Sequence, residues 1–361
     1  PCPHLRIAGR QIPVLLPSLH DARLKLSAVI VILQILGQTL LEFKVSIAQI
    51  LVTVGFCAII DTTVTLLRQG VLTWPASALL TGNSTAFILR ASGTQHGDWW
   101  SLRGIHLFIL AAGVALLVKY VVRPGGRHRF NPSNVGLVMV LIFIGPSHVF
   151  PQYLWWGPLA APVITALVVI GLGAVYVLRA VRMVGMATAF LAVFAAVIAV
   201  LAAGGRSFVA IWSAQPISGA SYWVYICTSP ELLIFVFFMM SDPATAAKGK
   251  SARVAFGSAT GIVAGLLVSL QPTEYGVKVA ILAALTVVCA CVPTIEALSE
   301  RFDRIGREPR SHRSVRLVRP RPVTIGVAMI AMIAVAGTAQ VAADRELLLI
   351  EQGLTRPGDA Q

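Results

Sequence analysis

The chain alternates long apolar runs with short polar segments, a pattern that predicts helices rather than strands. A helix needs about 20 mostly apolar residues to cross the hydrocarbon core of a bilayer. Six runs predict clear membrane spans: 104–122, 159–178, 184–203, 254–270, 277–293 and 323–342. Five less regular runs predict further spans: 26–43, 45–67, 71–89, 134–150 and 229–241. We therefore expect an all-α polytopic membrane protein with about 10 transmembrane helices.

Two polar interruptions share an amide or acidic residue directly before a proline. Asn131-Pro132 lies in the first half of the chain and Asp242-Pro243 in the second. Proline removes a backbone donor and disfavours helix in the residue before it. In a bilayer the freed backbone groups need protein or water around them. Two such breaks predict two pseudo-symmetric halves with broken helices around a central site.

A third interruption falls inside the run 71–89, where Thr81, Asn83 and Ser84 surround Gly82. We expect a break over 81–85 that lines a pore or cavity, because polar residues at membrane depth are tolerated beside a cavity. Small residues also allow helices to pack closely. The sequence leaves both interpretations open.

Composition agrees with a membrane location. Hydrophobic residues make up 57% of the chain and charged residues 12%, whereas a soluble domain is about 25% charged. With a cytoplasmic N-terminus, Lys and Arg favour the inner side by about three to one, as the positive-inside rule predicts. The net charge of +14 is therefore attributed to topology rather than to nucleic acid. Five segments are expected: 1–25 (cytoplasmic), 26–293 (membrane domain), 294–322 (basic cytoplasmic loop), 323–342 (last span) and 343–361 (polar tail).

The basic loop 294–322 carries an arginine at every third position from Arg301 to Arg319. Anionic lipid headgroups would hold such a segment at the membrane surface. An acidic soluble partner is the alternative. Nucleic acid is disfavoured, because only Phe302 interleaves with the arginines as a stacking residue.

Several polar residues lie within or beside the apolar runs. Asp61 is placed either at an interface or in a functional interior, since it falls near the end of its run. Lys119 lies near the inner end of 104–122 and is interpreted as a structural residue that reaches the interface. Glu231 follows Ser229-Pro230 near the predicted outer start of its span, where it would cap the helix or act as an outer gate. No cysteine or histidine spacing predicts a metal site.

Three stretches resemble a family of membrane flavoproteins. They are the small-residue helix Ser77–Gly82, the segment Gly126–Ser133, and Phe238–Ala246 with the following Gly249-Lys250. The pattern is similar to the NqrB/RnfD family, which contains membrane components of the Rnf electron-transport complex and of the sodium-pumping NADH:quinone reductase. The similarity covers about 70–293. The resemblance implies a bacterial inner-membrane protein that binds FMN or riboflavin and receives electrons from partner redox subunits.

The resemblance also implies flavin-binding residues. They would be Arg127, Asn131, Asp242, Thr245 and Lys250, with the basic side chains near any phosphate. Topology alone also accounts for the basic residues, and helix capping for Asn131 and Asp242. No glycine-rich dinucleotide motif follows a strand, so NADH is not expected to bind here.

In that family FMN is attached through its phosphate to a threonine in a Ser-Gly-Ala-Thr motif on the outer side. This chain has Ser218-Gly219-Ala220-Ser221, which makes Ser221 the candidate for covalent FMN. Only a short stretch separates Ser221 from Asp242, whereas several tens of residues and further spans separate the two motifs in the family. The spacing places covalent attachment in doubt.

Other stretches resemble a divergent branch of the family encoded in enediyne antibiotic clusters. They are Trp155–Pro158, Thr228–Glu231 and Pro272–Gly276. The sequence therefore supports two functions. One is a flavin-linked subunit of an electron-transport system coupled to transmembrane transport. The other is a solute channel or exporter on the same scaffold without redox chemistry.

Overall fold

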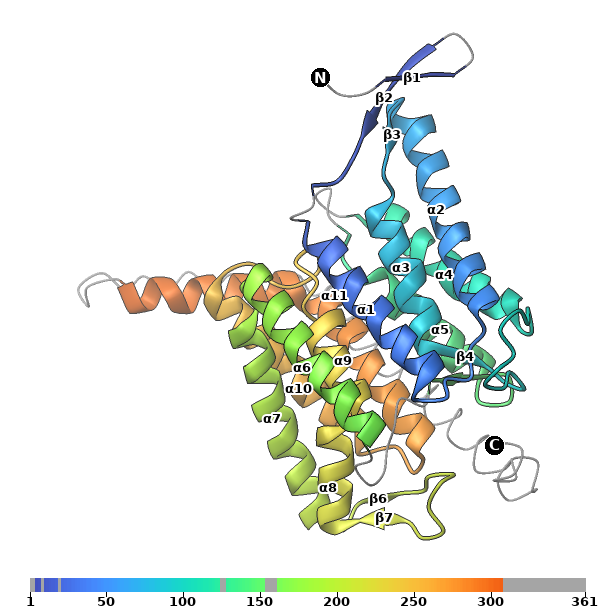
Figure 1. Ribbon diagram of the computed structural model, residues 1–361. Coiled ribbons are helices and arrows are strands. Elements are labelled where there is room, and N and C mark those ends of the chain that lie inside the picture. Colours follow the sequence, from blue (N-terminus) through green and yellow to red (C-terminus); the bar gives the residue numbers. More distant parts are fainter. Residues whose placement is uncertain (1–3, 8–9, 19–20, 124–127, 153–160, 308–361) are drawn as a thin grey trace.

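The computed structural model describes residues 4–7, 10–18, 21–123, 128–152 and 161–307. This part of the chain is mostly helical (Figure 1). By length and composition, six helical segments in it are able to cross a membrane. They are α2 (Ile47–Gln69), α6 (Ala161–Val181), α7 (Val184–Ala203), the combined segment Gly219–Met239, α10 (Lys250–Val268) and Glu274–Arg304 of α11 (Glu274–Arg307).

The expected count of about ten spans is not reached in the described residues. Four further runs do form helices there: α1 (Ala22–Thr39), α3 (Ala76–Ile88), α4 (Ile105–Val121) and α5 (Pro132–Ile144). These helices are shorter than 20 residues, and α3 and α5 have only 13 each. The predicted span 323–342, most of the loop 294–322 and the tail 343–361 lie outside the described residues.

Two short strands explain why α3 and α5 stop early. Strand β4 (Leu89–Ala91) follows α3, β5 (Val149–Pro151) follows α5, and the two strands pair antiparallel. Thirteen helical residues rise only about 20 Å, less than the hydrocarbon thickness of about 30 Å. The strand pair supplies hydrogen bonds to backbone groups that a longer helix would have satisfied internally.

The break in the first half is therefore at Leu89, not at 81–85 as expected. Thr81 Oγ1 donates to the carbonyl of Ser77 at 2.8 Å, so the hydroxyl is satisfied within a continuous helix. A side chain at Gly82 would come within 2.9 Å of Val54 Cα in α2. The small residues of α3 thus allow it to pack closely against α2.

A second irregular helix crosses the other half. Helix α8 (Gly219–Thr228) is followed by Ser229. The extended backbone of Ser229 separates α8 from α9 (Pro230–Ile234). The chain then forms the π-helical turn η2 (Phe235–Met239), which the bond from Met240 N–H to the Phe235 carbonyl closes at 2.9 Å. Proline at a first helical position and a single π turn are both expected at an interrupted helix.

Helix packing follows a similar order in two groups. In the first, α2 contacts α3 and α4, and α4 contacts α5. In the second, α7 contacts α8 and α10, and α10 contacts α11. Contacts of α1 with α6 and of α5 with α11 join the groups, and a large hydrophobic core includes residues of both. Small residues at the crossings let the backbones approach closely, including Gly136 of α5 and Gly257 of α10.

Short strands lie at the ends of the bundle. The hairpin of β1 (His4–Ile7) and β2 (Arg10–Leu15) projects from one end, where β2 pairs in parallel with β3 (Leu72–Thr73) (Figure 1). Strands β6 (Ser207–Phe208) and β7 (Ile217–Ser218) lie beside α8 at the opposite end.

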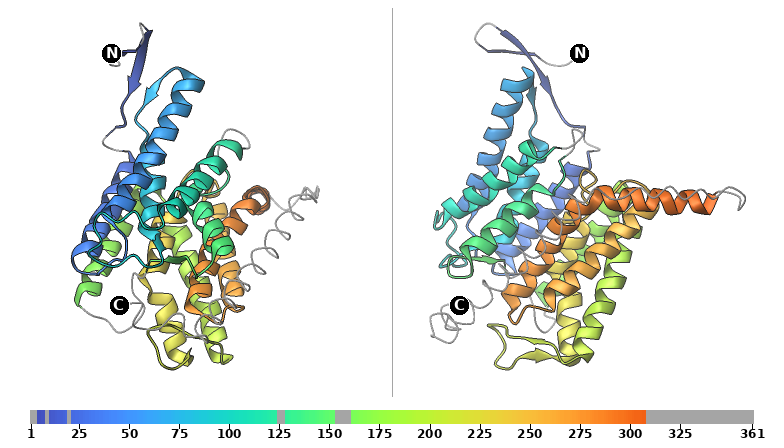
Figure 2. Two further views of the ribbon diagram at one scale, coloured as in Figure 1. Left: turned by 90° about the vertical axis from the view of Figure 1, so that its right-hand side faces the viewer. Right: turned by 180° about the vertical axis from the view of Figure 1, so that it is seen from behind.

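Helix α11 leaves the bundle after Pro293. Its first part packs in the bundle, and its last part runs away from it nearly sideways, as Figure 1 and the right-hand view of Figure 2 show. An internal proline is a usual cause of such a bend. The projecting part is held near its base, where Glu296 accepts a hydrogen bond from the Lys248 N–H at 2.7 Å.

Candidate functional site

The two proline breaks of the sequence meet at one cavity. It has a volume of about 370 Å³ and lies between α1, α3 and α5 on one side and α6 and η2 on the other. We call it the Asp242 cavity. Its polar lining comes from these side chains: Asp21, Arg23, Ser77, Thr81, Ser84, His128, Asn131, Ser133, Ser241 and Asp242.

Asn131 joins the two breaks directly. Its side-chain Oδ1 caps α5 by accepting from the Asn134 N–H at 3.1 Å, and it also accepts from Ser133 Oγ at 2.9 Å. Its Nδ2 donates to the carbonyl of Met239 at 3.0 Å. That carbonyl belongs to the π turn at the end of the helix, where an internal partner is missing in regular geometry. One amide thus satisfies groups from both interrupted segments.

Asp242 organises the turn that follows Met239. Its Oδ1 accepts from the Ala244 N–H at 3.0 Å, and its Oδ2 accepts from Thr245 Oγ1 at 3.3 Å. The Nε2 atom of His128 lies 3.7 Å from Asp242 Oδ2. The carboxylate is therefore held by the turn and has the His128 imidazole beside it.

A second carboxylate lies on the opposite wall. Asp21 caps α1 and accepts from the Arg23 guanidinium at 2.6 Å. The hydrogen bond from Arg23 lowers the pKa of the Asp21 carboxyl, which is then ionised at neutral pH. The ionisable side chains that line the cavity among the described residues are therefore two acids, one arginine and one histidine, and each acid lies beside a basic side chain.

Four of the predicted site residues line this cavity: Thr81, Ser84, Asn131 and Asp242. Thr245 does not line it, but its hydroxyl supports Asp242. Asn83 is buried and stands outside the lining, although it was expected to face a pore.

The remaining predicted residues lie elsewhere. Lys250 is exposed at the first position of α10 and does not line the cavity. Ser221 is exposed in the first turn of α8, at the far end of the candidate span Gly219–Met239 from the Asp242 cavity. Arg127 lies outside the described residues.

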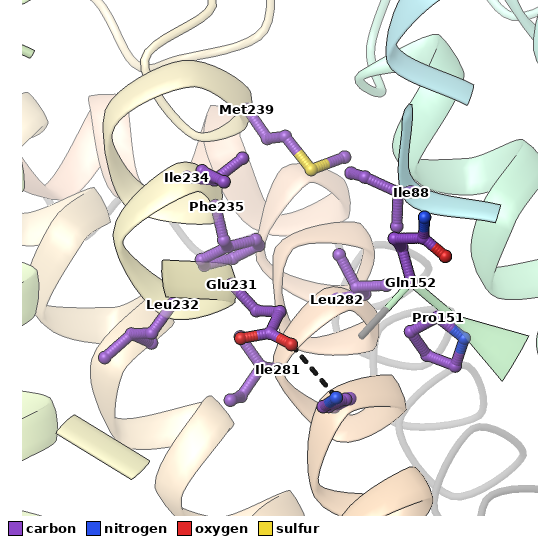
Figure 3. A pocket seen from close by; sticks show the side chains of 11 residues that line it. Ile88, Pro151, Gln152, Glu231, Leu232, Ile234, Phe235, Met239, Ile281 and Leu282 are labelled. Atoms are coloured by element: carbon purple, nitrogen blue, oxygen red, sulfur yellow. Dashed lines mark ion pairs between the residues drawn. The ribbon is translucent and has the colours of Figure 1, made fainter. Parts of the chain in front are cut away.

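A smaller cavity, of about 30 Å³, is lined mostly by apolar side chains (Figure 3). Its polar lining is Gln152, Glu231 and Lys278, and we call it the Glu231 cavity. Lys278 Nζ lies 3.0 Å from Glu231 Oε1 and 2.7 Å from Glu274 Oε1. The indole N–H of Trp212 donates to Glu274 Oε2 at 2.8 Å.

The position of Glu231 differs from that expected. It was placed near the outer start of a span, but α8 extends the candidate span back to Gly219. Glu231 therefore lies in the first turn of α9 at an internal break, where an acid suits the helix N-terminus, and its carboxylate also pairs with Lys278. The aromatic and polar residues of α8 concealed the earlier part of this span in the sequence.

Met239 lines both cavities. In Figure 3 its side chain lies at one edge of the Glu231 cavity, near Ile88. The Asp242 and Glu231 cavities thus share Met239 in their linings, and Asn131 holds the Met239 carbonyl from the other half of the chain.

A third polar cluster lies away from both cavities. Lys119 Nζ donates to Asp61 Oδ1 at 2.9 Å, and the Tyr120 hydroxyl donates to the same oxygen. Both charged side chains are largely buried between α2 and α4. Lys119 therefore pairs with Asp61 rather than reaching the interface as expected.

Three polar residues of the Glu231 cluster were not predicted from the sequence: Gln152, Glu274 and Lys278. Lys278 had a usable signal, because a lysine inside the apolar run 277–293 requires a partner at membrane depth. Its i,i+4 spacing to Glu274 pointed to one such partner. Gln152 had no comparable signal, since it follows an apolar run among aromatic residues.

The comparisons with known proteins do not identify the chain. No protein-family model matches it, and a search of curated proteins returned no match.

Proposed function

We propose that this chain is the membrane-embedded, flavin-binding subunit of an electron-transport system similar to Rnf and Nqr, coupled to transmembrane transport. The observation that carries the proposal is the Asp242 cavity, in which the two motifs that resemble that family come together. Its volume of about 370 Å³ lies within the usual range for small-molecule sites, about 300–1,000 Å³.

The lining suits an isoalloxazine ring. Leu26, Leu80 and Phe238 provide apolar and aromatic surface, and Asn131 and Ser84 provide groups that hydrogen-bond to a heterocycle edge. Both basic groups at the cavity already accompany carboxylates. The charge balance therefore favours riboflavin over the phosphate of FMN in this cavity.

Covalent FMN would occupy a different place. Ser221 is exposed in the first turn of α8, where helix N–H groups favour an attached phosphate. The proposal includes this site only as a second flavin. The donor subunits would dock at the end of the bundle where α11 projects, and this end would face the cytoplasm of a bacterial cell, with the N-terminus on the same side.

The matched packing order supports two pseudo-symmetric halves of five helical segments each. In this arrangement α1 to α5 would correspond to α6, α7, the α8–η2 segment, α10 and α11. The interrupted segments that follow α2 and α7 would then be equivalent, and both reach the shared centre.

A solute channel or exporter is the second candidate function. The lining residue Met239, which the two cavities share, supports it, because two neighbouring cavities could form part of a route across the bundle. This function would fit a role in natural-product export, such as that of an enediyne, without redox chemistry.

The deciding experiment is visible absorbance and flavin fluorescence of protein purified in detergent from a flavin-replete host, before and after acid precipitation. We expect flavin in the supernatant. Ser77→Phe should displace it by filling the Asp242 cavity, while Leu79→Phe, on the same helix but outside the lining, should retain it. Flavin in the pellet that Ser221→Ala removes would establish covalent attachment. Folded wild-type protein without flavin would overturn the redox proposal in favour of the channel.

A further inference from the structure

The part of α11 that follows Pro293 is not needed to cross the bilayer. Residues 274–293 of this helix already provide about 20 residues, enough to span the hydrocarbon core. The remaining residues, 294–307, run sideways past α7, at the level where α6 ends and where α7 and α10 begin (Figure 1 and Figure 2). We call this part the projecting helix. Its direction and level place it along the boundary between the bilayer and water.

The projecting helix has one exposed apolar face. Leu298 and Phe302 are one turn apart on it, and their exposed fractions are 46% and 72%. Ile295, one turn before Leu298, packs against the hydrophobic core of the bundle. The face that contacts the core at the base of the helix therefore continues beyond the bundle as an apolar surface.

The other side of the projecting helix is polar and is fixed to the start of α10. Glu296 accepts a backbone hydrogen bond from the segment before α10, and Asp303 Oδ2 accepts from Ser251 Oγ at 2.7 Å. Farther from this contact, Glu300 and Arg304 form an exposed ion pair. These bonds set the rotation of the helix about its axis. An apolar face opposite a charged face is typical of a helix that lies in a membrane interface.

Two features indicate that phospholipid meets the apolar face. Val184 near the start of α7 and Val254 near the start of α10 are exposed apolar residues at this end of the bundle, so the acyl region of a bilayer would begin there. Anionic headgroups would complement the charge of this end. Its exposed basic side chains are those of Arg179, Arg182, Lys248 and Lys250. The sequence after the helix adds an arginine at every third position up to Arg319.

We propose that the projecting helix lies in the headgroup layer of the bilayer around the bundle, with Leu298 and Phe302 inserted at the acyl boundary and anionic phospholipids bound by the basic side chains of this end. The polar side of the helix stays in water, where a soluble subunit can reach it. The inference goes beyond the proposed function and does not depend on it, because it concerns the outer surface of the bundle rather than the Asp242 cavity. A soluble protein on the apolar face is the alternative.

The first test measures which face of the projecting helix contacts lipid. The full-length chain, with its native cysteines replaced, carries Leu298→Cys, Phe302→Cys, Glu300→Cys or Arg304→Cys, and a nitroxide is attached to the new thiol. Each protein is placed in nanodiscs of phosphatidylcholine and phosphatidylglycerol. Collisions of the nitroxide with oxygen, which dissolves in lipid, and with a water-soluble nickel complex are measured by electron paramagnetic resonance. We expect severalfold fewer nickel collisions for labels at 298 and 302 than for labels at 300 and 304, and more oxygen collisions.

The outcomes separate lipid, water and protein. Equal nickel collisions for Phe302→Cys and Arg304→Cys would place the apolar face in water and overturn the proposal. Exclusion of both oxygen and nickel from the Phe302→Cys label would show that protein covers this face, and would overturn it as well. All four labelled positions are exposed, and circular dichroism and size-exclusion chromatography establish that each variant is folded. Flavin content is measured in the same samples, so the flavin and lipid assignments can fail separately.

The second test concerns the anionic headgroups. In the labelled Phe302→Cys protein, nanodiscs of phosphatidylcholine alone should give severalfold more nickel collisions than nanodiscs that contain phosphatidylglycerol. Adding Lys248→Gln and Arg304→Gln should have the same effect in the anionic nanodiscs. Arg206→Gln is the control, because Arg206 is exposed directly before β6 at the opposite end of the bundle. Equal nickel collisions in the two kinds of nanodisc would refute the binding of anionic phospholipids.

Discussion

Replacing Asp61 by asparagine tests the buried ion pair between α2 and α4. The substitution removes the negative charge but keeps the size of the side chain. Lys119 Nζ, now 2.9 Å from a carboxylate, would face a neutral amide. The side chains of Lys119 and Asp61 are only 11% and 12% exposed. Removing one member of such a pair costs about 3–5 kcal/mol of stability, because the other charge stays buried.

The reverse substitution should cost less. In Lys119→Met the Asp61 carboxylate retains the hydrogen bond from the Tyr120 hydroxyl, and one surviving charged hydrogen bond is worth about 1.5–3 kcal/mol. The double variant Asp61→Leu/Lys119→Met removes both charges and fills the space with apolar groups. Its stability should approach that of the wild type, since an apolar replacement of a buried pair is often neutral.

Unfolding by sodium dodecyl sulfate in mixed micelles, followed by tryptophan fluorescence, measures these differences as a double-mutant cycle. Glu300→Gln is the control, because its exposed pair with Arg304 should contribute about 0–1 kcal/mol. Additive single effects no larger than the control would show that Asp61 and Lys119 are solvated, and would refute the argument from burial.

Three smaller predictions concern packing and caps. Gly136→Ala should cost at least about 1–3 kcal/mol, because its new methyl group would collide with a backbone carbonyl of α4, whereas Gly113→Ala meets open space and should be neutral in the same unfolding assay. Asn131→Ala should lower the free energy of unfolding by about 1 kcal/mol for the lost helix cap alone, and by more because the Met239 carbonyl also loses its hydrogen-bond donor. A loss smaller than that of the cap would contradict the hydrogen bond between the halves. The lowered pKa of Asp21 means that its ionised form adds stability above the ordinary aspartate pKa and loses it as pH falls through the lower folded value. Asp21→Asn should therefore reduce the loss of unfolding free energy on acidification by at most about 1 kcal/mol, since its arginine partner is half exposed. The change is followed through the pH dependence of the thermal midpoint.

Apolar run length predicted most of the helices. Helix α7 occupies the predicted residues 184–203, and α6 and α2 begin and end within a few residues of their predicted runs. Twenty apolar residues must form helix in a membrane, because the backbone has no other partners there. This constraint is local, so the sequence expresses it directly.

Interruptions were harder to place, because their cause lies in other parts of the chain. Helix α3 was expected to break at its polar residues, yet it continues to Ile88 because its hydroxyls bond within the helix and Gly82 packs on α2. It ends where the chain forms β4, which pairs with β5, a strand about 60 residues later in the chain. Hydroxyl content within a run therefore does not locate a break when the pairing partner is remote.

Pairs of buried polar residues show the same limit. Each of Asp61, Lys119 and Glu231 was visible as a charged residue near membrane depth, but the sequence did not show which residue each would meet. The partners of Lys119 and Glu231 lie on other helices. Only the pair of Glu274 and Lys278 has a signal in the sequence itself, because their spacing places both on one helix face.

Asn131 and Met239 explain why the two proline breaks matter together. The side-chain oxygen of Asn131 caps its own helix, but its amide nitrogen also binds the carbonyl of Met239, which lines both cavities. The carbonyl of Met239 is therefore held from the first half of the chain. A ligand that displaced the Asn131 amide in the Asp242 cavity would release that carbonyl.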